Sequence, residues 1–257
     1  GCSLWHQDSA FMMMLRVLVC WLLLTSLVWS DASRDFDGTG DFLDMGNINN
    51  VTTGDVSLCG WLDVDVGTNI GCLGCKRNSY ATATDAGYGL YYTAAETASF
   101  RVCDGVAIFG SIGTTNLDTG TRWKALCGTW DATSEITTVY VDGAQDDTDD
   151  YAGVGSLSNT VVFRAGSSAG GGQQVNGRLT YVQQWAVILT LVEINEIMWF
   201  PERITTASST TWGGLWPIWG SDSPEIDLSG DGSTGTVNGT TANADGPPVM
   251  FGGGLPL

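Results

Sequence analysis

Segment 123–143, which reads WKALCGTWDATSEITTVYVDG, restricts the fold of this chain more than any other stretch of its sequence. Two runs rich in β-branched and aromatic residues flank the polar loop 131–135, a pattern that predicts a β-hairpin. The second run places alternate residues on opposite faces, as a strand does. Asp142 and Gly143 then predict a tight turn, because glycine adopts a positive φ at little cost. The segment therefore indicates an antiparallel sheet.

Several other segments show the same alternation of residues. Segment 56–66, VSLCGWLDVDV, has one apolar and one mixed face, and it predicts a half-buried strand. The turn 37–40 predicts a connection between two short strands. Segment 145–150, QDDTDD, is expected to be an acidic loop. Further strands are predicted at 70–76, 87–93, 98–103, 106–109, 160–164 and 177–187.

One helix is expected near the end of this run of strands. Thr190 and Glu193 have the spacing of a capping box, in which each side chain bonds the other's backbone amide. Pro201 is expected to end the helix, because proline cannot donate a backbone hydrogen bond. Three apolar residues follow the cap at helical spacing: Ile194, Ile197 and Met198. The pattern as a whole predicts an all-β, two-sheet sandwich with one short helix.

The charge of the chain limits its partners. Asp and Glu number 28 against 10 Lys and Arg, which gives a formal net charge of -18. Such a surface repels phosphate groups and anionic membranes, so we expect no nucleic-acid partner.

Arg16 and the apolar run 17–24 resemble a secretory signal, with cleavage expected after Ala32. The run is too short for a stable membrane span, and the alternative that residues 1–32 are translated upstream sequence stays open.

The histidine and cysteine content excludes several kinds of site. The single histidine, His6, lies in the segment expected to be removed, so histidine-dependent catalysis and histidine-bound metals are excluded for the remainder. Five cysteines follow residue 32, and their odd number predicts at least one free thiol. The pair Cys72 and Cys75 lacks the further ligands of a zinc site. If one disulfide forms, Cys103–Cys127 is the first pairing to test.

The ordered motifs together resemble a laminin-G-like jelly-roll domain of the concanavalin A-like lectin and glucanase superfamily. The resemblance rests on the FDG and DFL motifs at 36–38 and 41–43, on segment 123–143, and on the helix start LTLVEI at 189–194. It covers residues 33–204 and implies a two-sheet antiparallel jelly roll whose members mostly bind glycans or proteins. Residues 205–257 form a Gly- and Trp-rich extension that we expect to pack on the sandwich or to begin another repeat.

Glycan binding requires exposed aromatic rings beside polar groups. The residues that we expect to meet this requirement are Tyr88, Tyr91, Tyr92, Trp130 and Asp131. Calcium prefers several carboxylate and carbonyl oxygens. Two groups of residues offer such oxygens, and Ca²⁺ is therefore the one cofactor that the sequence suggests: Asp146, Asp147, Asp149 and Asp150 in the first, and Asp227, Ser229 and Asp231 in the second.

A glycosidase site is not favoured. Some enzymes of the superfamily carry E-x-D-x-x-E on one strand, and Glu225 and Asp227 begin this motif, but its second glutamate is missing. Asp63 and Asp65 share a strand face without a third acid. The resemblance thus implies a secreted or surface-associated module that binds a glycan or a surface protein, without catalytic residues and without stable insertion in a membrane. A structural module of a phage or cell-surface assembly is the open alternative.

Overall fold

The structure is a computed structural model that describes residues 32–65, 69–118, 123–201, 212–218, 223–230 and 232–248. The chain divides into two units, Gly1–Ser30 and Asp31–Leu257, and all described residues belong to the second. Residues 1–31 of the expected signal segment, the boundary at residue 204 and Asp231 lie outside the described residues.

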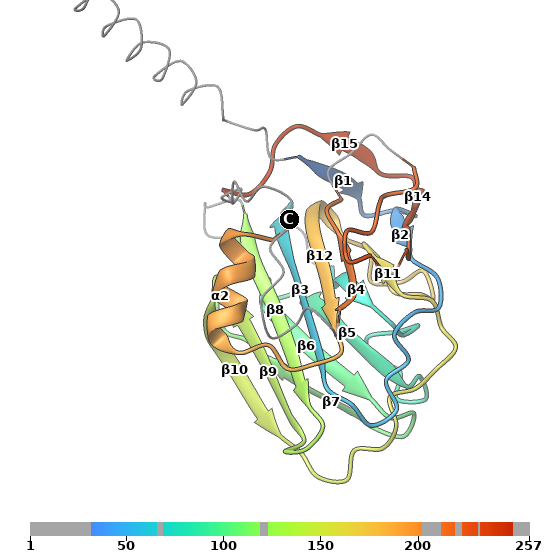
Figure 1. Ribbon diagram of the computed structural model, residues 1–257, viewed down its shortest axis with the longest axis vertical. Helices are drawn as coiled ribbons and strands as arrows, with labels where there is room; N and C mark the ends of the chain where they lie inside the picture. The colour runs from blue at the N-terminus through green and yellow to red at the C-terminus, as the bar shows by residue number, and fades with distance from the viewer. Residues whose placement is uncertain are drawn as a thin grey trace, which may run out of the picture. The chain divides into compact units, whose positions relative to one another are not determined.

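Two antiparallel sheets form the second unit, and they face each other as a sandwich (Figure 1). The first sheet has eight strands: β10 (Ala144–Asp150), β9 (Ile136–Val141), β8 (Lys124–Asp131), β3 (Val56–Val64), β12 (Asn176–Trp185), β1 (Ser33–Asp37) and β15 (Thr241–Asn243) in this order, with β13 (Trp212–Trp216) also paired to β12. The second has seven: β14 (Thr236–Asn238), β2 (Phe42–Asp44), β11 (Arg164–Ala165), β4 (Gly71–Cys75), β5 (Gly87–Tyr92), β6 (Ala98–Cys103) and β7 (Ile108–Ile112).

This arrangement confirms the predicted all-β jelly-roll sandwich and its central hairpin. Strands β8 and β9 pair with Leu126 opposite Val141 and Asp131 opposite Ile136. Asp142 and Gly143 both have positive φ, which is the geometry of a hairpin turn with two left-handed residues. The hairpin leads directly into β10, so the segment 145–150 that was expected to be an acidic loop is an edge strand. Exposed carboxylates on an edge strand discourage pairing with other chains.

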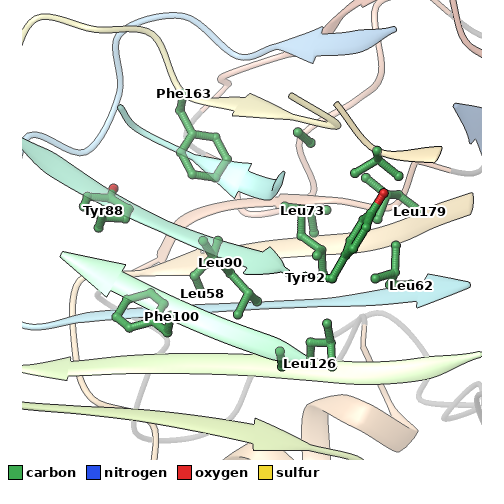
Figure 2. Packing of buried hydrophobic residues seen from close by; sticks show 14 of the residues in the cluster. Leu58, Leu62, Leu73, Tyr88, Leu90, Tyr92, Phe100, Leu126, Phe163 and Leu179 are labelled. Carbon is green, nitrogen blue, oxygen red and sulfur yellow. The ribbon is translucent and has the colours of Figure 1, made fainter. Parts of the chain in front are cut away.

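The main core lies between the two sheets. Figure 2 shows its side chains, among them Leu58, Leu126 and Leu179 from the first sheet and Leu90 and Phe100 from the second. These five side chains are 1 % exposed or less. Burial of this apolar area is the main force that holds the sheets together. The turn 37–40 leads from β1 in the first sheet to β2 in the second, so the two predicted short strands do not pair with each other.

Helix α2 (Leu191–Trp199) covers the outer face of the first sheet. The predicted capping box is confirmed, with the Thr190 side chain bonded to the Glu193 amide and Glu193 bonded back. Ile194, Ile197 and Met198 form a second cluster with β3, β8 and β12. Because this cluster also covers Trp61, β3 is buried on both faces, and the expectation of a half-buried strand was wrong. Within the described ranges, no helix combines the length and apolar character needed to cross a bilayer.

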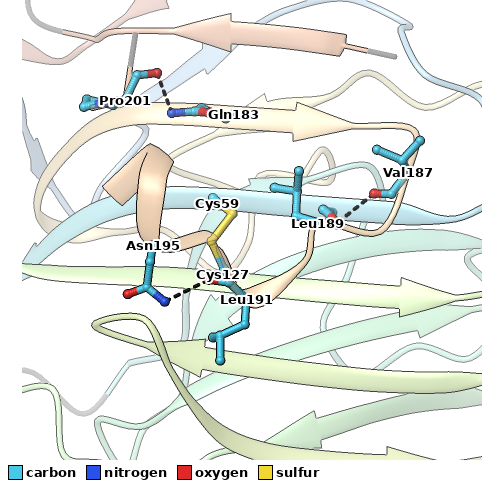
Figure 3. The surroundings of a disulfide bond; sticks show 9 residues. Cys59, Cys127, Gln183, Val187, Leu189, Leu191, Asn195 and Pro201 are labelled. Atoms are coloured by element: carbon cyan, nitrogen blue, oxygen red, sulfur yellow. Dashed lines mark hydrogen bonds between the residues drawn. A yellow bond between two sulfur atoms is a disulfide. The ribbon is translucent and has the colours of Figure 1, made fainter. Parts of the chain in front are cut away.

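The disulfides differ from the prediction. Cys59 and Cys127 lie opposite each other on the paired strands β3 and β8 and form a disulfide under α2 (Figure 3). Cys72 and Cys75 form the second disulfide on β4. The predicted pairing of Cys103 with Cys127 was wrong, because their strands β6 and β8 lie in different sheets. Cys103 is buried and free, which confirms the expectation of an unpaired thiol.

The last described segments of the chain pair with both sheets. Strand β13 pairs with β12, β14 with β2, and β15 with β1. Trp216 is fully buried, stacks on Phe163 with ring centroids 5.5 Å apart, and donates its indole hydrogen bond to the Ser233 carbonyl at 2.6 Å. The end of the chain therefore contributes strands and core side chains to the sandwich.

Candidate functional site

The aromatic residues expected to form an exposed platform are core residues. Tyr88, Tyr91, Tyr92 and Trp130 are between 0 and 3 % exposed, so the expectation of an exposed platform was wrong for all four. Three of them share the inner face with the apolar residues of the main core. The fourth, Tyr91, points to the outer face, where the segment after β4 covers it. A strand pattern predicts which residues share a face, but it does not predict what covers that face.

Asp131 has a role within the hairpin turn. Its Oδ1 accepts hydrogen bonds from the backbone amides of Thr133 at 2.8 Å and Ser134 at 3.0 Å. Bonding to Ser134, through its side chain and its amide, and to Thr133 holds the pKa of Asp131 below its ordinary value. The carboxylate thus fixes the turn between β8 and β9, which is a structural function.

The first acidic cluster predicted for calcium does not converge on one point. Asp146 bonds Thr115, and Asp147 accepts from the Ile112 amide at 2.8 Å, so β10 ties the neighbouring segment after β7 to itself. Asp149 and Asp150 are exposed on the same strand. The expectation of a loop was wrong, because the segment pairs with β9 as a strand, and Asp146 and Asp147 are already bonded to Thr115 and Ile112.

The second predicted cluster is organised around Asp227. Its carboxylate accepts from the backbone amides of Leu215 at 3.1 Å, Ser229 at 2.9 Å and Ser233 at 3.1 Å. It thereby joins the segment 227–233 to β13. Across the described part of the chain, no three His, Cys, Asp or Glu residues are grouped to hold a metal ion. Asp231 of the second cluster lies outside the described residues, and calcium at either cluster stays a prediction.

An open hollow of about 360 Å³ brings four other carboxylates together. It lies at the end of β1, where the chain turns toward β2, and beside the first residues of β12 and β15. Its lining residues come from distant parts of the sequence: Asp35, Phe36, Asp37, Asp41, Asp65, Asn176, Gly177, Gly239 and Thr241. Its size falls within the range of ligand pockets, but its lining is far more polar than usual.

Hydrogen bonds hold the carboxylates of the hollow in place. Asn243 donates to both oxygens of Asp35, at 2.9 and 2.8 Å. Asp37 receives a bond from the Thr39 amide at 2.7 Å, and its own amide donates to Asp41 at 2.9 Å. Gly239 lies so close to Asp41 that a Cβ there would meet its Oδ1 at 1.8 Å. Asp35, Asp37 and Asp41 are therefore held in place before any ligand binds.

The electrostatics of the hollow are unfavourable for Asp41 when it is ionised. Burial raises its pKa most strongly, and the charge of Asp37 and its hydrogen bond raise it further, whereas the Asp37 amide lowers it. Asp65 is exposed at the rim, and within the described residues its carboxylate makes no hydrogen bond. The hollow consequently offers several hydrogen-bond acceptors with a negative potential, which suits hydroxyl groups and cations and repels anions.

The carboxylates considered for hydrolysis are engaged elsewhere. Asp63 is 4 % exposed and pairs with Arg178, which also pairs with Asp245. Glu225 is 2 % exposed and pairs with Arg34. Both acids hold strands together. Two residues of the hollow, Asp37 and Asp41, belong to the sequence motifs that supported the fold. Their spatial neighbours Asp65, Asn176 and Thr241 are distant in sequence, so only the strand topology shows that they lie there.

Comparison with known proteins supports the fold. In solved structures, the chain is similar to a candidate carbohydrate binding protein from Bacteroides ovatus ATCC 8483, with 17 % identity, a TM-score of 0.63, and coverage of 86 % of this chain and 62 % of that one. It is also similar to a heptameric SAP-like pentraxin from Limulus polyphemus, with 15 % identity, a TM-score of 0.54, and coverage of 85 % and 97 %. The chain thus spans less than two thirds of the Bacteroides protein. No curated protein sequence matches it.

Sequence comparison gives the family. The model of the Laminin_G_3 family, described as concanavalin A-like lectin/glucanases superfamily, matches residues 37–195, which is more than half of the 257 residues. The matched region begins at Asp37 in the hollow and ends within α2. The chain belongs to the concanavalin A-like lectin/glucanases superfamily.

Proposed function

We propose that this chain is a non-catalytic carbohydrate-binding module and that the acidic hollow holds the sugar. The observation that supports this site is the set of acceptors in the hollow. Asp35, Asp37 and Asp41 are held by hydrogen bonds, and Asp65 lies at the rim, beside Asn176 and Thr241. Sugars present closely spaced hydroxyl groups, and a hydrogen bond to a charged acceptor is roughly twice as strong as one between neutral groups. Neutral sugars fit this lining, whereas sugar acids are repelled by it.

The geometry of the acids supports binding rather than hydrolysis. Glycosidases place two carboxyl groups about 5 Å or more apart, on either side of the bond that breaks. Asp37 and Asp41 belong to one short turn, in which the Asp37 amide donates to the Asp41 carboxylate at 2.9 Å, so this pair is not arranged on either side of a bound sugar. The other candidates, Asp63 and Glu225, are buried in ion pairs.

The proposal includes an extracellular or surface-associated location. Two disulfides, Cys59–Cys127 and Cys72–Cys75, suit an oxidising compartment. The net charge of -18 suits a protein that stays soluble outside the cell. Calcium assistance remains a proposal, without an assigned site among the described residues.

A glycan array tests the proposal, with the purified chain applied in calcium and in EGTA. We expect binding to neutral oligosaccharides, with a loss of about tenfold in affinity when both Asp65→Ala and Thr241→Ala are introduced, since two direct contacts are removed. Asp118→Ala, a change at an exposed acid outside the hollow, is the matched control.

The array also decides between the alternatives. Equal binding by the hollow variant and by wild type would place the sugar elsewhere. A chain that binds no glycan in either buffer, but assembles with itself or a surface protein, would favour the structural module instead. Binding that disappears in EGTA would support the calcium-assisted form of the proposal.

A further inference from the structure

Three described basic residues have no acidic partner: Lys76, Arg77 and Arg101. The Lys76 ammonium is satisfied by neutral groups, since it donates to the Asn47 side chain and to the Val161 carbonyl, each at 2.8 Å. Arg34, Lys124, Arg164 and Arg178 each form an ion pair with an Asp or Glu. Within the described ranges, Arg77 and Arg101 form none, although the chain has 28 acidic residues. The two guanidinium groups nevertheless reach the same loop, since Arg77 Nη2 donates to the Thr82 carbonyl at 2.9 Å and Arg101 Nη1 donates to the Tyr80 carbonyl at 3.5 Å. In agreement with this placement, the charge of Arg77 lowers the pKa of Arg101.

Arg77 is completely buried and only partly hydrogen-bonded. Its Nη2 donates to the Thr82 carbonyl at 2.9 Å, while Nε and Nη1 have no hydrogen-bond partner in the described structure. A buried cation without a partner is strongly unfavourable, because it has lost its hydration and gained nothing in exchange. Such a group indicates a missing ion or molecule.

Tyr91 presents a third buried polar group to the same place. The residue is 0 % exposed, and its hydroxyl has no hydrogen-bond partner in the described part of the chain. Burial raises the pKa of Tyr91, and the neighbouring charges of Arg77 and Arg101 oppose that rise. Because the Tyr91 ring packs on Tyr80, which also contacts Arg101, the neutral Tyr91 hydroxyl can donate to an anion bound at this cluster.

Tyr80 and Arg101 form the outer part of this cluster. The ring of Tyr80 meets that of Tyr91 edge to face, with centroids 5.0 Å apart, and the Arg101 guanidinium lies 3.6 Å from the Tyr80 centroid. Arg101 is half-buried, whereas Arg77 lies deeper. Arg101 is therefore the group that an anion from solvent meets first.

We infer that Arg77, Arg101 and Tyr91 form a binding site for one anionic group, and that this group is the carboxylate or sulfate of an acidic sugar. Guanidinium groups bind both anions through paired hydrogen bonds. The second half of this inference rests on the proposed function. It extends that function, because the acidic hollow repels a sugar acid and the arginine cluster attracts one.

The arginine cluster and the hollow are connected by a short stretch of backbone. Gln173 accepts a hydrogen bond from the Tyr80 amide at 3.1 Å, and Asn176 lines the hollow. Three residue steps of at most about 3.8 Å each separate them, so their Cα atoms lie within about 11 Å. An oligosaccharide of a few units has the length to place hydroxyl groups at one site and an acid group at the other.

Thermal unfolding tests the anion site, with sodium sulfate and sodium glucuronate as probes and sodium chloride at equal ionic strength as reference. Sulfate also stabilises folded proteins without binding to a site, so the Tm excess is defined as the rise in wild type beyond the rise in Arg101→Gln and Tyr91→Phe under the same salts. We expect both probes to give such an excess, because they bind only the folded state. Tyr91→Phe keeps the buried ring, so it is expected to fold without loss of stability. Arg164→Gln, which removes an ion-paired arginine, is the control expected to retain the excess.

Calorimetry with a neutral oligosaccharide and its sulfated counterpart tests the nature of the ligand. We expect the sulfated form to bind wild type about tenfold or more tightly, and this preference to disappear in Tyr91→Phe and Arg101→Gln. Equal affinity of wild type for the neutral and the sulfated oligosaccharide would overturn this inference and leave the proposed function standing. A Tm excess without glycan binding would support a site for free anions only and would overturn its assignment to a sugar. No Tm excess would mean that water satisfies these groups and would overturn the site itself.

Discussion

Buried polar contacts at single residues join the first strand to the last segments of the chain. Arg34 on β1 pairs with Glu225, and Asp35 is bonded by Asn243 on β15. The Ser33 hydroxyl donates to the Asp245 carbonyl at 2.6 Å. Because Asp35 and Thr241 also line the hollow, these contacts set the position of two of its walls.

At Asp41 we predict that Asn increases stability at neutral pH. Its pKa in the folded state is raised above 3.8, so the ionised form is disfavoured by folding and the protonated form is favoured. Asp41→Asn keeps the acceptor for the Asp37 amide and removes a charge. We expect a gain of up to about 1 kcal/mol at pH 7, measured by urea unfolding.

The pH dependence of this gain follows from the direction of the pKa shift. As pH falls through the raised pKa of Asp41, the wild-type carboxyl takes up its proton in the folded state and recovers the lost stability. The difference between Asp41→Asn and wild type should therefore shrink as the solution becomes acidic. A stability difference between the variant and wild type that is constant from pH 7 to pH 3 would show that folding does not raise the pKa of Asp41.

The helix and the strands differ in how well their sequence predicted them. The capping box at Thr190 could be predicted from the sequence because it is local, with donor and acceptor three residues apart. The hairpin of β8 and β9 could be predicted for the same reason. The sequence did not predict the burial of Tyr91 or the disulfide partner of Cys127, because both depend on segments that are distant in sequence. For the same reason the sequence did not predict the hollow, because its lining residues range from Asp35 to Thr241.

For helix α2 we predict that its cap contributes measurably to the stability of the sandwich. Thr190→Ala removes the side-chain acceptor for the Glu193 amide, and we expect a loss of about 1 kcal/mol in the free energy of unfolding. Val192→Ala, at a helix position that is 77 % exposed, is the matched control and should change stability by a few tenths at most. Equal effects of the two substitutions would contradict the role of the cap.

At the scale of the whole molecule, the described residues form a sandwich in which one disulfide lies within each sheet. Mass spectrometry of peptides prepared without reduction is expected to find Cys59 joined to Cys127 and Cys72 joined to Cys75. Cys103 should react with N-ethylmaleimide only after unfolding, because it is buried. A peptide that joins Cys103 to Cys127 would contradict the strand order of the two sheets.

The central claim is that the acidic hollow binds sugar, and a crystal structure with the best neutral oligosaccharide from the array tests it most directly. We predict sugar hydroxyl groups within hydrogen-bond distance of Asp37, Asp41 and Asp65, with the backbone of the hollow unchanged from the unliganded protein. An oligosaccharide seated on another face, with the hollow filled only by solvent, would contradict the claim.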